Sequence, residues 1–389
     1  MINRHYWTLS GYYACYFGVL GVWLPYWPLY LDNLGIGPEM IGMLSAAALG
    51  LKVIAPPVWG GLADRGARHL VVVGTSFATV AGFGLFFFGV SPLFLGLVTV
   101  VYSFFHAGPL VMVEATTMEW VARHDRDYGR IRLWGSVGFI ILSLGAGPIL
   151  DRWGIQWILE IILLLLVVDA LLTLGLPRSE QGMVRQSSGQ FGRLFKRPGV
   201  TWFYLSTLLM QFSHGAYYGF MSLHLENNGF SRTEIGLLWA LGVAAEVGVM
   251  VWSRPLLKRF GISTVLVGSI FIAAIRWSIY GFTLWLPLLI IGQLLHAFTF
   301  GSFHVAAIQR VFELSPPGGQ ATAQGWYSAF SFGLGGSMGM IVSGYLFKLQ
   351  GAQTLFIYMS LAALIGALIS WHASRVLQRA GLLTVKNEN

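Results

Sequence analysis

The sequence predicts an all-α integral membrane protein of twelve transmembrane helices, arranged as two pseudo-symmetric six-helix bundles. Three observations predict this fold class. Of the 389 residues, 56% are hydrophobic and only 10% are charged, whereas soluble domains carry about 25% charged residues. The apolar residues gather in twelve long segments, and the second half of the chain repeats the pattern of the first. A soluble fold of this size could not bury so much apolar surface, whereas a lipid bilayer accepts it.

The expected helices follow from segment length, because a helix needs about 20 mostly apolar residues to cross a bilayer. The first apolar run continues to about Leu31, contains Trp23 and Pro25 and lacks a small-residue cleavage site. We therefore expect a spanning helix there rather than a signal peptide. In chain order, the expected helices cover residues 8–31, 39–62, 70–89, 93–118, 131–150, 155–176, 200–225, 232–256, 263–283, 286–311, 322–347 and 352–374.

The charges of the loops predict the orientation, because cytoplasmic loops of membrane proteins are enriched in lysine and arginine. With the N-terminus inside, 19 of the 24 basic residues fall on cytoplasmic segments. The outer loops hold only Arg152, Arg232 and Lys348, while Lys52 and Arg276 lie within helices. This asymmetry predicts a multi-pass protein of a bacterial inner membrane, with an even number of helices and both termini in the cytoplasm.

One loop differs from the others in length and composition. Residues 177–198 are polar, basic and contain Gly and Ser, and this composition at the midpoint of the chain is typical of a linker. We therefore predict an N-terminal six-helix bundle over residues 1–176, a cytoplasmic linker over 177–198 and a C-terminal six-helix bundle over 199–389.

The two predicted bundles are related in sequence. A shift of 194 residues places YLDNLGIGPEMIGML at 30–44 over HLENNGFSRTEIGLL at 224–238, with six identical residues and with Asp32 over Glu226. Two parallel repeats of six helices imply a pseudo-two-fold axis along the membrane normal. The same arrangement predicts a binding site between the halves near the middle of the membrane.

Composition and motifs narrow the class of function. The basic residues behind the formal charge of +8 sit in short loops, and the single cysteine, Cys15, cannot form an intrachain disulfide. No metal-ligand spacing, nucleophile triad or phosphate-binding loop is visible in the sequence. We therefore expect a protein that is not an enzyme and needs no metal or cofactor, with a proton gradient as its energy source. The expected partners are a small-molecule substrate, protons and the lipid bilayer, without nucleic acid, and we expect a monomer.

Ionisable residues inside the helices are the candidates for function, because charges at bilayer depth are unfavourable unless they face a cavity or a partner. Lys52 lies in the middle of the second helix, and the 194-residue shift places Glu246 at the same point of the eighth. The other such residues are Glu114, Arg132, Glu160, Asp169 and Arg276. Structural roles stay open for some of them: an ion pair of Glu246 with Arg276, helix packing by Lys52, and structural pairing or interface exposure for Glu160 and Asp169.

Two polar stripes are expected to line a cavity, because their spacing places each on one face of a helix. The stripe on the tenth helix consists of Gln293, His296, Phe300 and His304. The stripe on the seventh helix consists of Gln211, His214 and Tyr218. Histidine titrates near neutral pH, so the stripe on the tenth helix could bind and release protons.

The loop GGLADRGARH at 60–69 joins the second and third expected helices. Its glycines allow close approach of helices, and Asp64 can cap a helix or pair with Arg65 or Arg68. We interpret this loop as a cytoplasmic gating latch, with a simple charged tight turn as the alternative. Its counterpart in the second half, RPLLKRFG, lacks the acid.

The loop at 60–69 resembles the signature of the major facilitator superfamily. The segment VEATTME at 113–119 followed by YGRIRLWGSVGF at 128–139 resembles the lactose permease branch of that superfamily. In that branch a helix-4 glutamate and a helix-5 arginine contribute to the substrate site. The resemblance assigns these roles to Glu114 and Arg132.

The second half carries the same resemblance with one departure. Arg276, His296 and Glu246 are similar to the helix-9 arginine, helix-10 histidine and helix-8 glutamate of the lactose permease branch. That branch carries a further glutamate three residues after the histidine, where this chain has Thr299. The proton-release step of that branch therefore does not carry over to this chain.

Four further segments resemble the phenylpropionic acid permease family, and the resemblance covers nearly the whole chain. The segments are HGAYYGF at 214–220, LWALGVAAEV at 238–247, RWSIYG at 276–281 and QLLHAFTF at 293–300. This resemblance implies the major facilitator fold and proton-coupled uptake of aromatic carboxylates.

Residues and resemblance together predict a proton-coupled secondary transporter that imports a small aromatic carboxylate, such as phenylpropionate, by alternating access. The candidates for substrate binding are Lys52, Glu114, Arg132, Arg276 and Tyr218. The candidates for proton coupling are Glu246, His296 and His304, and Glu114 could also titrate. In our hypothesis, Lys52 or Arg276 holds the substrate carboxylate while Glu246 and His296 exchange the proton.

Two alternatives share the same fold. A sugar or oligosaccharide/proton symporter is favoured by Glu114 and Arg132, because a carboxylate and a guanidinium can clasp hydroxyl groups. A small-molecule or drug exporter is the other. A membrane enzyme or sensor is disfavoured because the sequence shows no catalytic motif.

Overall fold

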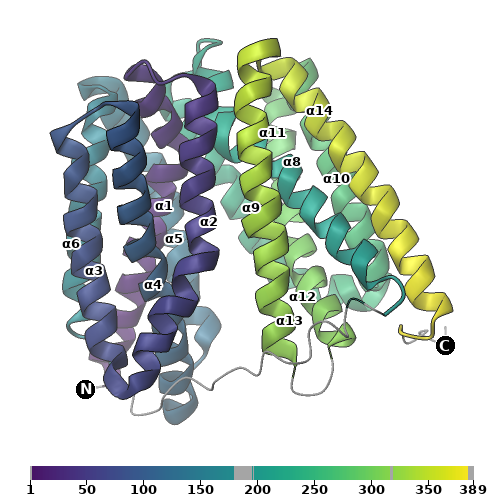
Figure 1. The fold of residues 1–389 in the computed structure, drawn as a ribbon, viewed down its shortest axis with the longest axis horizontal. Coiled ribbons are helices and arrows are strands. Elements are labelled where there is room, and N and C mark those ends of the chain that lie inside the picture. Colours follow the sequence, from purple (N-terminus) through teal and green to yellow (C-terminus); the bar gives the residue numbers. More distant parts are fainter. Residues whose placement is uncertain (1, 179–194, 196, 316–318, 384–389) are drawn as a thin grey trace. The chain divides into compact units, whose positions relative to one another are not determined.

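The computed structural model describes residues 2–178, 195, 197–315 and 319–383, and every regular element within these ranges is a helix. Figure 1 shows their arrangement. The α-helices are α1 (Ile2–Asn33), α2 (Pro38–Leu62), α3 (Arg68–Gly84), α4 (Pro92–His124), α5 (Tyr128–Trp153), α6 (Ile158–Thr173), α8 (Val200–Glu226), α9 (Arg232–Phe260), α10 (Ile262–Phe282), α11 (Leu286–Leu294), α12 (Phe303–Leu314), α13 (Gln320–Ser328) and α14 (Ser337–Arg379).

Short helical turns of other types join some of these helices. The 3-10 turns are η2 (Leu85–Phe88) and η3 (Ile155–Trp157), and the π-helical turns are η1 (Ala63–Ala67), η5 (Ala297–Ser302) and η6 (Ala329–Gly336). The tenth expected span is therefore α11, η5 and α12 in succession, and the eleventh is α13, η6 and the first part of α14. Gly351, at φ 79°, interrupts α14 and separates the last two spans.

The helices agree with the predicted membrane fold. Each of the twelve expected segments coincides with helix in the described ranges, and most bounds differ from those predicted by a few residues. Nine spans in these ranges are long and apolar enough to cross a membrane by a strict criterion, and one of them, Thr322–Arg379, contains the break at Gly351. The prediction of an all-α, multi-pass membrane protein is confirmed.

The chain folds as two compact units. One consists of Met1–Val184 with Tyr218–Val243, and the other of Arg185–Tyr217 with Ala244–Asn389. We call them unit 1 and unit 2. The predicted bundles 1–176 and 199–389 stay a prediction, and most of the predicted linker 177–198 lies outside the described residues.

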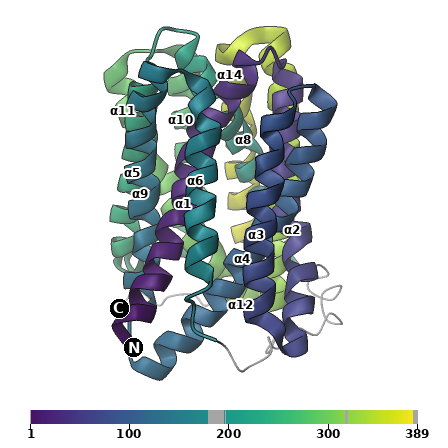
Figure 2. The same cartoon turned by 90° about the vertical axis from the view of Figure 1, so that its left-hand side faces the viewer.

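In unit 1, α1 packs against α5 and α6, while α4 packs against α2 and α3, as can be followed in Figure 2. The α1–α5 crossing depends on small residues. A Cβ added to Gly21 would lie 2.5 Å from the carbonyl oxygen of Phe139, and one added to Gly138 would collide with the carbonyl of Ala14. Such glycines let two membrane helices approach backbone to backbone.

Unit 2 repeats this crossing between α8 and α14. Gly215 lies 194 residues after Gly21, and a Cβ added to it would collide with the backbone of Gly339. A Cβ on Gly339 would in turn collide with the carbonyl of Phe212. The sequence repeat therefore corresponds to a repeat of helix packing.

The helix bounds follow the same shift. Pro38, Arg68 and Pro92 begin α2, α3 and α4, and adding 194 gives residues 232, 262 and 286, which begin α9, α10 and α11. The ends of α1 and α8 match as well, through Gly35 at φ 77° and Gly229 at φ 87°. In each case the residue after the glycine donates its N–H to the carbonyl five residues earlier, which is a Schellman cap.

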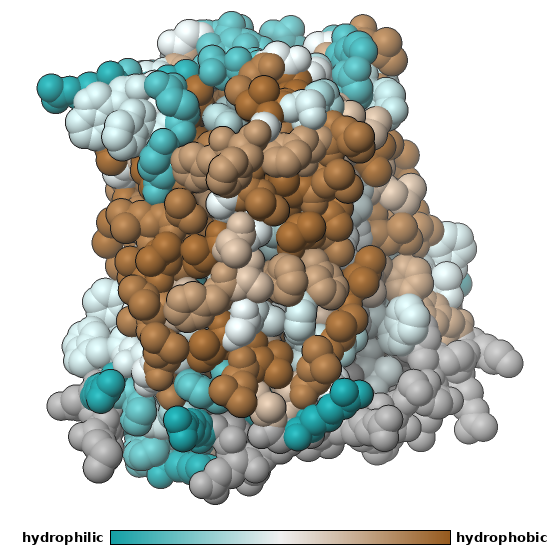
Figure 3. Space-filling view, turned by 60° about the vertical axis from the view of Figure 1, so that its left-hand side comes forward, coloured by the Kyte–Doolittle hydropathy of each residue, from teal (hydrophilic) through white to brown (hydrophobic). Residues whose placement is uncertain are grey.

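Apolar side chains cover the surface that such a protein presents to lipid. Figure 3 shows them in a broad brown band across the middle of one face, with hydrophilic side chains toward the two ends. Phe88, Leu93 and Val251 are among the most exposed, at 81%, 76% and 75%. Patches of this size are rare on soluble monomers and are typical of membrane contact.

Hydrogen bonds from other parts of unit 1 cap the N-terminus of α9. The Asp151 carboxylate, at the end of α5, accepts the backbone N–H groups of Arg232 at 3.0 Å and Thr233 at 2.9 Å, and the Thr233 hydroxyl at 2.6 Å. Tyr26 donates to the carbonyls of Ser143 and Arg232. A carboxylate at this position also favours the positive end of the helix dipole.

Candidate functional site

Arg276 of α10 is the centre of a polar network in unit 2. Its side chain is fully buried. Its Nε donates to the Gly292 carbonyl at 2.7 Å, and its Nη2 donates to Gln293 Oε1 at 3.3 Å. Its Nη1 donates to Thr299 Oγ1 at 3.2 Å and faces His296 Nδ1 at 3.0 Å. A buried guanidinium needs such a set of acceptors, because an unsatisfied buried charge is strongly destabilising.

Aromatic rings surround the same guanidinium. Its central carbon lies 4.2 Å from the ring centre of Tyr217, 4.8 Å from that of Trp277 and 5.6 Å from that of Tyr280. A desolvated cation–π contact contributes about 2 kcal/mol. Tyr217 also donates to Gln293 Oε1 at 3.0 Å, so the rings and the hydrogen bonds hold Arg276 in one position.

The Arg276 contact fixes the tautomer of His296. A guanidinium can only donate, so His296 Nδ1 must accept and the neutral ring carries its proton on Nε2. That atom lies 3.7 Å from Glu246 Oε2. Arg276, His296 and Glu246 therefore form a line from a buried cation to a carboxylate whose side chain is 15% exposed.

The backbone around His296 is irregular. The π-helical turn η5 begins directly after it, and such turns are frequent at functional sites. Gly301 in this turn brings the chain so close to α9 that an added Cβ would lie 3.2 Å from Glu246 Cγ. Thr299, where the lactose permease branch has a glutamate, accepts a hydrogen bond from Arg276.

The stripe expected on the tenth span forms a column of rings. His296 stacks on Phe300 at 5.5 Å, and Phe300 stacks on His304 at 6.0 Å with an interplanar angle of 8°. Gln293 and His296 reach Arg276, whereas His304 packs against Tyr327 and Phe332. The structure thus brings Glu246 and His296 together and places His304 further along the column.

The residues of the expected stripe on α8 lie in different surroundings. Gln211 and His214 are buried, and His214 Nδ1 lies 2.8 Å from the Met210 carbonyl of its own helix. Tyr218 packs against Trp239 at 6.2 Å within unit 1, while its neighbour Tyr217 contacts Arg276. The sequence pattern identified the helix but missed Tyr217, together with the rings of Trp277 and Tyr280.

Lys52 occupies a different environment in unit 1. Its side chain is exposed although it lies in the middle of α2. Its helix, α2, packs against α4. Helix packing by Lys52 stays an alternative, because protein atoms surround its ammonium group even though the side chain keeps accessible surface.

Glu114 and Arg132 meet as their spacing predicts. Arg132 Nε lies 4.0 Å from Glu114 Oε1, and both side chains are about one-third exposed. The guanidinium also lies 3.9 Å from the ring centre of Phe17 and 5.6 Å from that of Tyr13. An accessible carboxylate, guanidinium and aromatic face together could bind a hydroxylated or an anionic ligand.

The candidate latch contains a short ion pair. Arg68 Nη1 lies 2.6 Å from Glu119 Oε1, and the Arg68 side chain is only 4% exposed. This pair ties the start of α3 to the end of α4. Arg65 is exposed, and the side chain of Asp64 lies outside the described residues. Glu119 is therefore one partner of Arg68 within the described residues.

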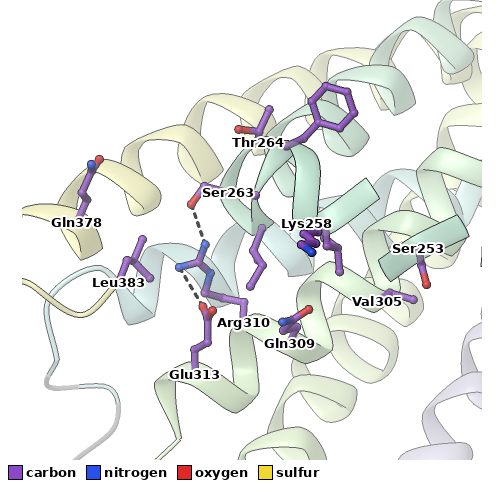
Figure 4. A pocket seen from close by; sticks show the side chains of 14 residues that line it. Ser253, Lys258, Ser263, Thr264, Val305, Gln309, Arg310, Glu313, Gln378 and Leu383 are labelled. Carbon is purple, nitrogen blue, oxygen red and sulfur yellow. Dashed lines mark hydrogen bonds and ion pairs between the residues drawn. The ribbon is translucent and has the colours of Figure 1, made fainter. Parts of the chain in front are cut away.

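Another arginine–glutamate pair lies at the edge of a cavity of about 960 Å3 in unit 2. Figure 4 shows Arg310 between Ser263 and Glu313. Its Nη2 donates to Ser263 Oγ at 2.7 Å, and its Nη1 lies 3.5 Å from Glu313 Oε2. Glu313 lies 194 residues after Glu119, but its partner Arg310 lies on the same helix, α12, whereas Arg68 lies on α3 and reaches Glu119 on α4. None of the predicted site residues lines this cavity.

Comparison with known proteins decides the family. The sequence model of the MFS_1 like family matches residues 6–358. The chain belongs to the MFS_1 like family. This confirms the predicted fold class and the resemblance to the major facilitator superfamily, and it makes the protein a membrane transporter.

Proteins similar to this chain are named for different substrates. The chain is 32% identical to the Escherichia coli (strain K12) protein named "Probable 3-phenylpropionic acid transporter", over 92% of this chain and 95% of that protein. It is 26% identical to the maltose permease of Geobacillus stearothermophilus, over 92% of each chain. The crystal structure of the nucleoside transporter NupG matches with a TM-score of 0.85 at 20% identity, over 95% of this chain and 99% of that one. The last match supports the fold alone.

Proposed function

We propose that this MFS_1 like protein imports a small aromatic carboxylate, such as 3-phenylpropionate, together with protons by alternating access. The observation that carries the proposal is the line from Arg276 through His296 to Glu246. It links a buried cation to a carboxylate that can titrate. The relative named for 3-phenylpropionic acid supports the substrate class.

Glu246 is the proton carrier in this proposal. His296 Nδ1 accepts from Arg276, so a second proton on the ring would break that contact. Glu246 can take up a proton at Oε2 without disturbing Arg276, and it then loses its attraction to the His296 Nε2–H. His296 acts as a positioning residue, and the proton on Glu246 is released when the binding side changes. His304 remains a second candidate for proton exchange.

Lys52 is the residue that we assign to the substrate carboxylate. Arg276 is fully buried, and its Nε, Nη1 and Nη2 all have neutral acceptors. Lys52 is exposed, and an ammonium donates three hydrogen bonds. Of the two cations in our hypothesis, Lys52 is therefore the one that can bind an anion without rearrangement.

A sugar symporter is the second candidate function. The accessible pair of Glu114 and Arg132, stacked on Phe17, is a group that could bind sugar hydroxyls. The maltose permease relative gives this alternative its support. Drug export remains an alternative on the fold alone.

The setting of the transporter is part of the proposal. The charge asymmetry of the loops supports an inner-membrane location with both termini in the cytoplasm. We propose a monomer that is driven by the proton gradient, needs no cofactor and does not bind nucleic acid.

The test uses uptake into membrane vesicles that contain the full chain. Glu246→Gln should abolish gradient-driven accumulation of labelled 3-phenylpropionate while sparing equilibrium exchange, because the amide keeps the shape but cannot carry a proton. Glu160→Gln on the exposed face of α6 is the matched control and should behave as wild type. Normal accumulation by Glu246→Gln would exclude this mechanism. Uptake of labelled maltose that 3-phenylpropionate does not inhibit would favour the sugar symporter.

A further inference from the structure

The cavity of about 960 Å3 beside Arg310 has no role in the proposed transport mechanism, and positive charge prevails on its wall. Among the described residues, three charged side chains line it: Lys258 at the end of α9, and Arg310 and Glu313 on α12. The Arg310 side chain is only 3% exposed, whereas Lys258 is exposed. Two cations against one carboxylate favour an anion in this cavity. We call it the polar cavity.

Arg310 has a donor that lacks a hydrogen-bond acceptor. Its Nη2 donates to Ser263 Oγ at 2.7 Å, as Figure 4 shows. Its Nη1 has no hydrogen-bond partner in the described part of the chain, and its ion pair with Glu313 is 3.5 Å long. A buried donor without an acceptor is unfavourable. An oxygen of a bound anion near Nη1 would therefore stabilise this wall of the polar cavity.

The N-terminus of α10 supplies further donors to the same cavity. Residues 261–264, at this helix start, all line it. Of the side chains that the structure describes, none caps this helix end, and the first N–H groups of a helix have no acceptor within the helix. The Ser263 hydroxyl accepts from Arg310 and keeps its own hydrogen for a ligand. Helix N–H groups, a hydroxyl and two cations together suit the oxygens of a phosphate group.

A second hollow, an apolar groove of about 530 Å3, adjoins the polar cavity. It is lined by α9 and by Phe298 of η5, and every residue that lines it is apolar except Arg259. Trp252, Leu256 and Arg259 belong to its wall and follow the spacing of one helical face. Phe260 lines both hollows, so the polar cavity and the apolar groove meet at its ring.

The apolar groove begins within the part of α9 that is apolar enough to cross a membrane. Its first residues, Ala245 and Gly248, belong to the span Arg232–Ser253. Val251 and Trp252 are 75% and 70% exposed, as expected for side chains in contact with lipid. The polar cavity lies at the end of this helix, which we predict to be cytoplasmic. A phospholipid has the same order of groups, with an acyl chain in the bilayer and a phosphate at its surface, whereas a soluble phosphate would fill the polar cavity alone.

We propose that unit 2 binds one anionic phospholipid, with its phosphate in the polar cavity and an acyl chain in the apolar groove. Lys258, the Ser263 hydroxyl and the N–H groups of α10 hold the phosphate oxygens, and Arg310 supplies the buried positive charge. A zwitterionic lipid binds less well, because its own cationic group is repelled by Lys258 and Arg310. This binding does not depend on which substrate the protein transports.

The first test compares two lipids that have the same acyl chains. The purified full chain in a neutral detergent is mixed with equal amounts of phosphatidylglycerol and phosphatidylcholine, and native mass spectrometry counts the lipids that stay bound. Wild type should retain phosphatidylglycerol in preference to phosphatidylcholine. Equal retention of the two lipids would overturn the proposal.

Variants locate the phosphate. Lys258→Gln should weaken binding of phosphatidylglycerol about fivefold, the value for one basic residue near an anionic lipid. Arg123→Gln, which removes an exposed charge at the end of α4 in unit 1, is the matched control and should bind as wild type. If Lys258→Gln binds phosphatidylglycerol as wild type does, the polar cavity is not the headgroup site.

Gly248→Leu tests the apolar groove and separates a lipid from a soluble phosphate. A Cβ added to Gly248 meets no atom within 4 Å, so a larger side chain can enter the groove. This variant should melt as wild type in detergent alone but should lose the rise in melting temperature that phosphatidylglycerol gives wild type. Inorganic phosphate at the same concentration should raise neither melting temperature. Stabilisation of both proteins by inorganic phosphate, or an unchanged lipid response of Gly248→Leu, would overturn the proposal of a lipid site.

Discussion

Replacement of His296 by its two amide mimics separates the two contacts of the imidazole. In His296→Asn, the side-chain oxygen takes the place of Nδ1 and can accept from Arg276, but nothing replaces the Nε2–H that faces Glu246. In His296→Gln, the amide nitrogen takes the place of Nε2 and can still donate toward Glu246, but Arg276 Nη1 loses an acceptor.

The structure gives the size of each effect. Arg276 is fully buried, and the bond from its Nη1 to His296 Nδ1 is 3.0 Å long. A buried donor left without a partner costs about 1–3 kcal/mol. Since about 1 kcal/mol shifts the melting temperature of a domain of this size by roughly 2–4 °C, His296→Gln should melt about 2–12 °C lower. His296→Asn should melt close to wild type.

The two variants should differ in the opposite sense in transport. His296→Asn should lose gradient-driven accumulation, because the hydrogen that holds the Glu246 carboxylate is gone. His296→Gln should keep accumulation at temperatures where it is folded. Thermal unfolding in detergent and uptake into vesicles measure the two properties separately. Equal stability of the variants, or accumulation by His296→Asn but not by His296→Gln, would refute the assigned tautomer.

Three further predictions concern the packing and the ion pairs of unit 1. A double-mutant cycle on Arg68→Ala and Glu119→Ala, measured by thermal unfolding, should give a coupling free energy of about 1–3 kcal/mol, because Arg68 is buried. A value near zero would contradict a stabilising role for this ion pair. Asp151→Asn should speed amide hydrogen exchange at Thr233, since loss of an N-terminal cap costs about 1 kcal/mol. Gly138→Ala should destabilise the chain by about 1–3 kcal/mol through overpacking, and a wild-type melting temperature would contradict the α1–α5 crossing.

Most of the fold could be predicted from the sequence because the bilayer imposes a simple rule of length and polarity. The expected helix over 39–62 is α2, Pro38–Leu62. The 194-residue shift predicted related halves, and the matching helix starts and glycine caps agree with it. The rule does not report irregular turns, so η5 and η6 inside the tenth and eleventh spans were not predicted.

The candidate site could be predicted at the level of helices but not of every side chain. The spacing of Gln293 and His296 predicted a shared face, and both contact Arg276. The choice of Tyr218 over Tyr217 could not be made from spacing, because adjacent residues on α8 point about 100° apart and both faces carry aromatic side chains. The burial of Asp169 in α6 was also beyond reach, since it depends on the contacts of α6 with α1 and α3.

Proton movement during substrate entry tests the central claim most directly. Purified protein in liposomes without an imposed gradient should take up protons when 3-phenylpropionate is added outside, which a pH-sensitive dye would report as alkalinisation of the medium. Maltose should cause no change, and Glu246→Gln should abolish the signal. Uptake of labelled phenylpropionate without proton movement would contradict proton coupling, and a signal from maltose alone would contradict the aromatic carboxylate as substrate.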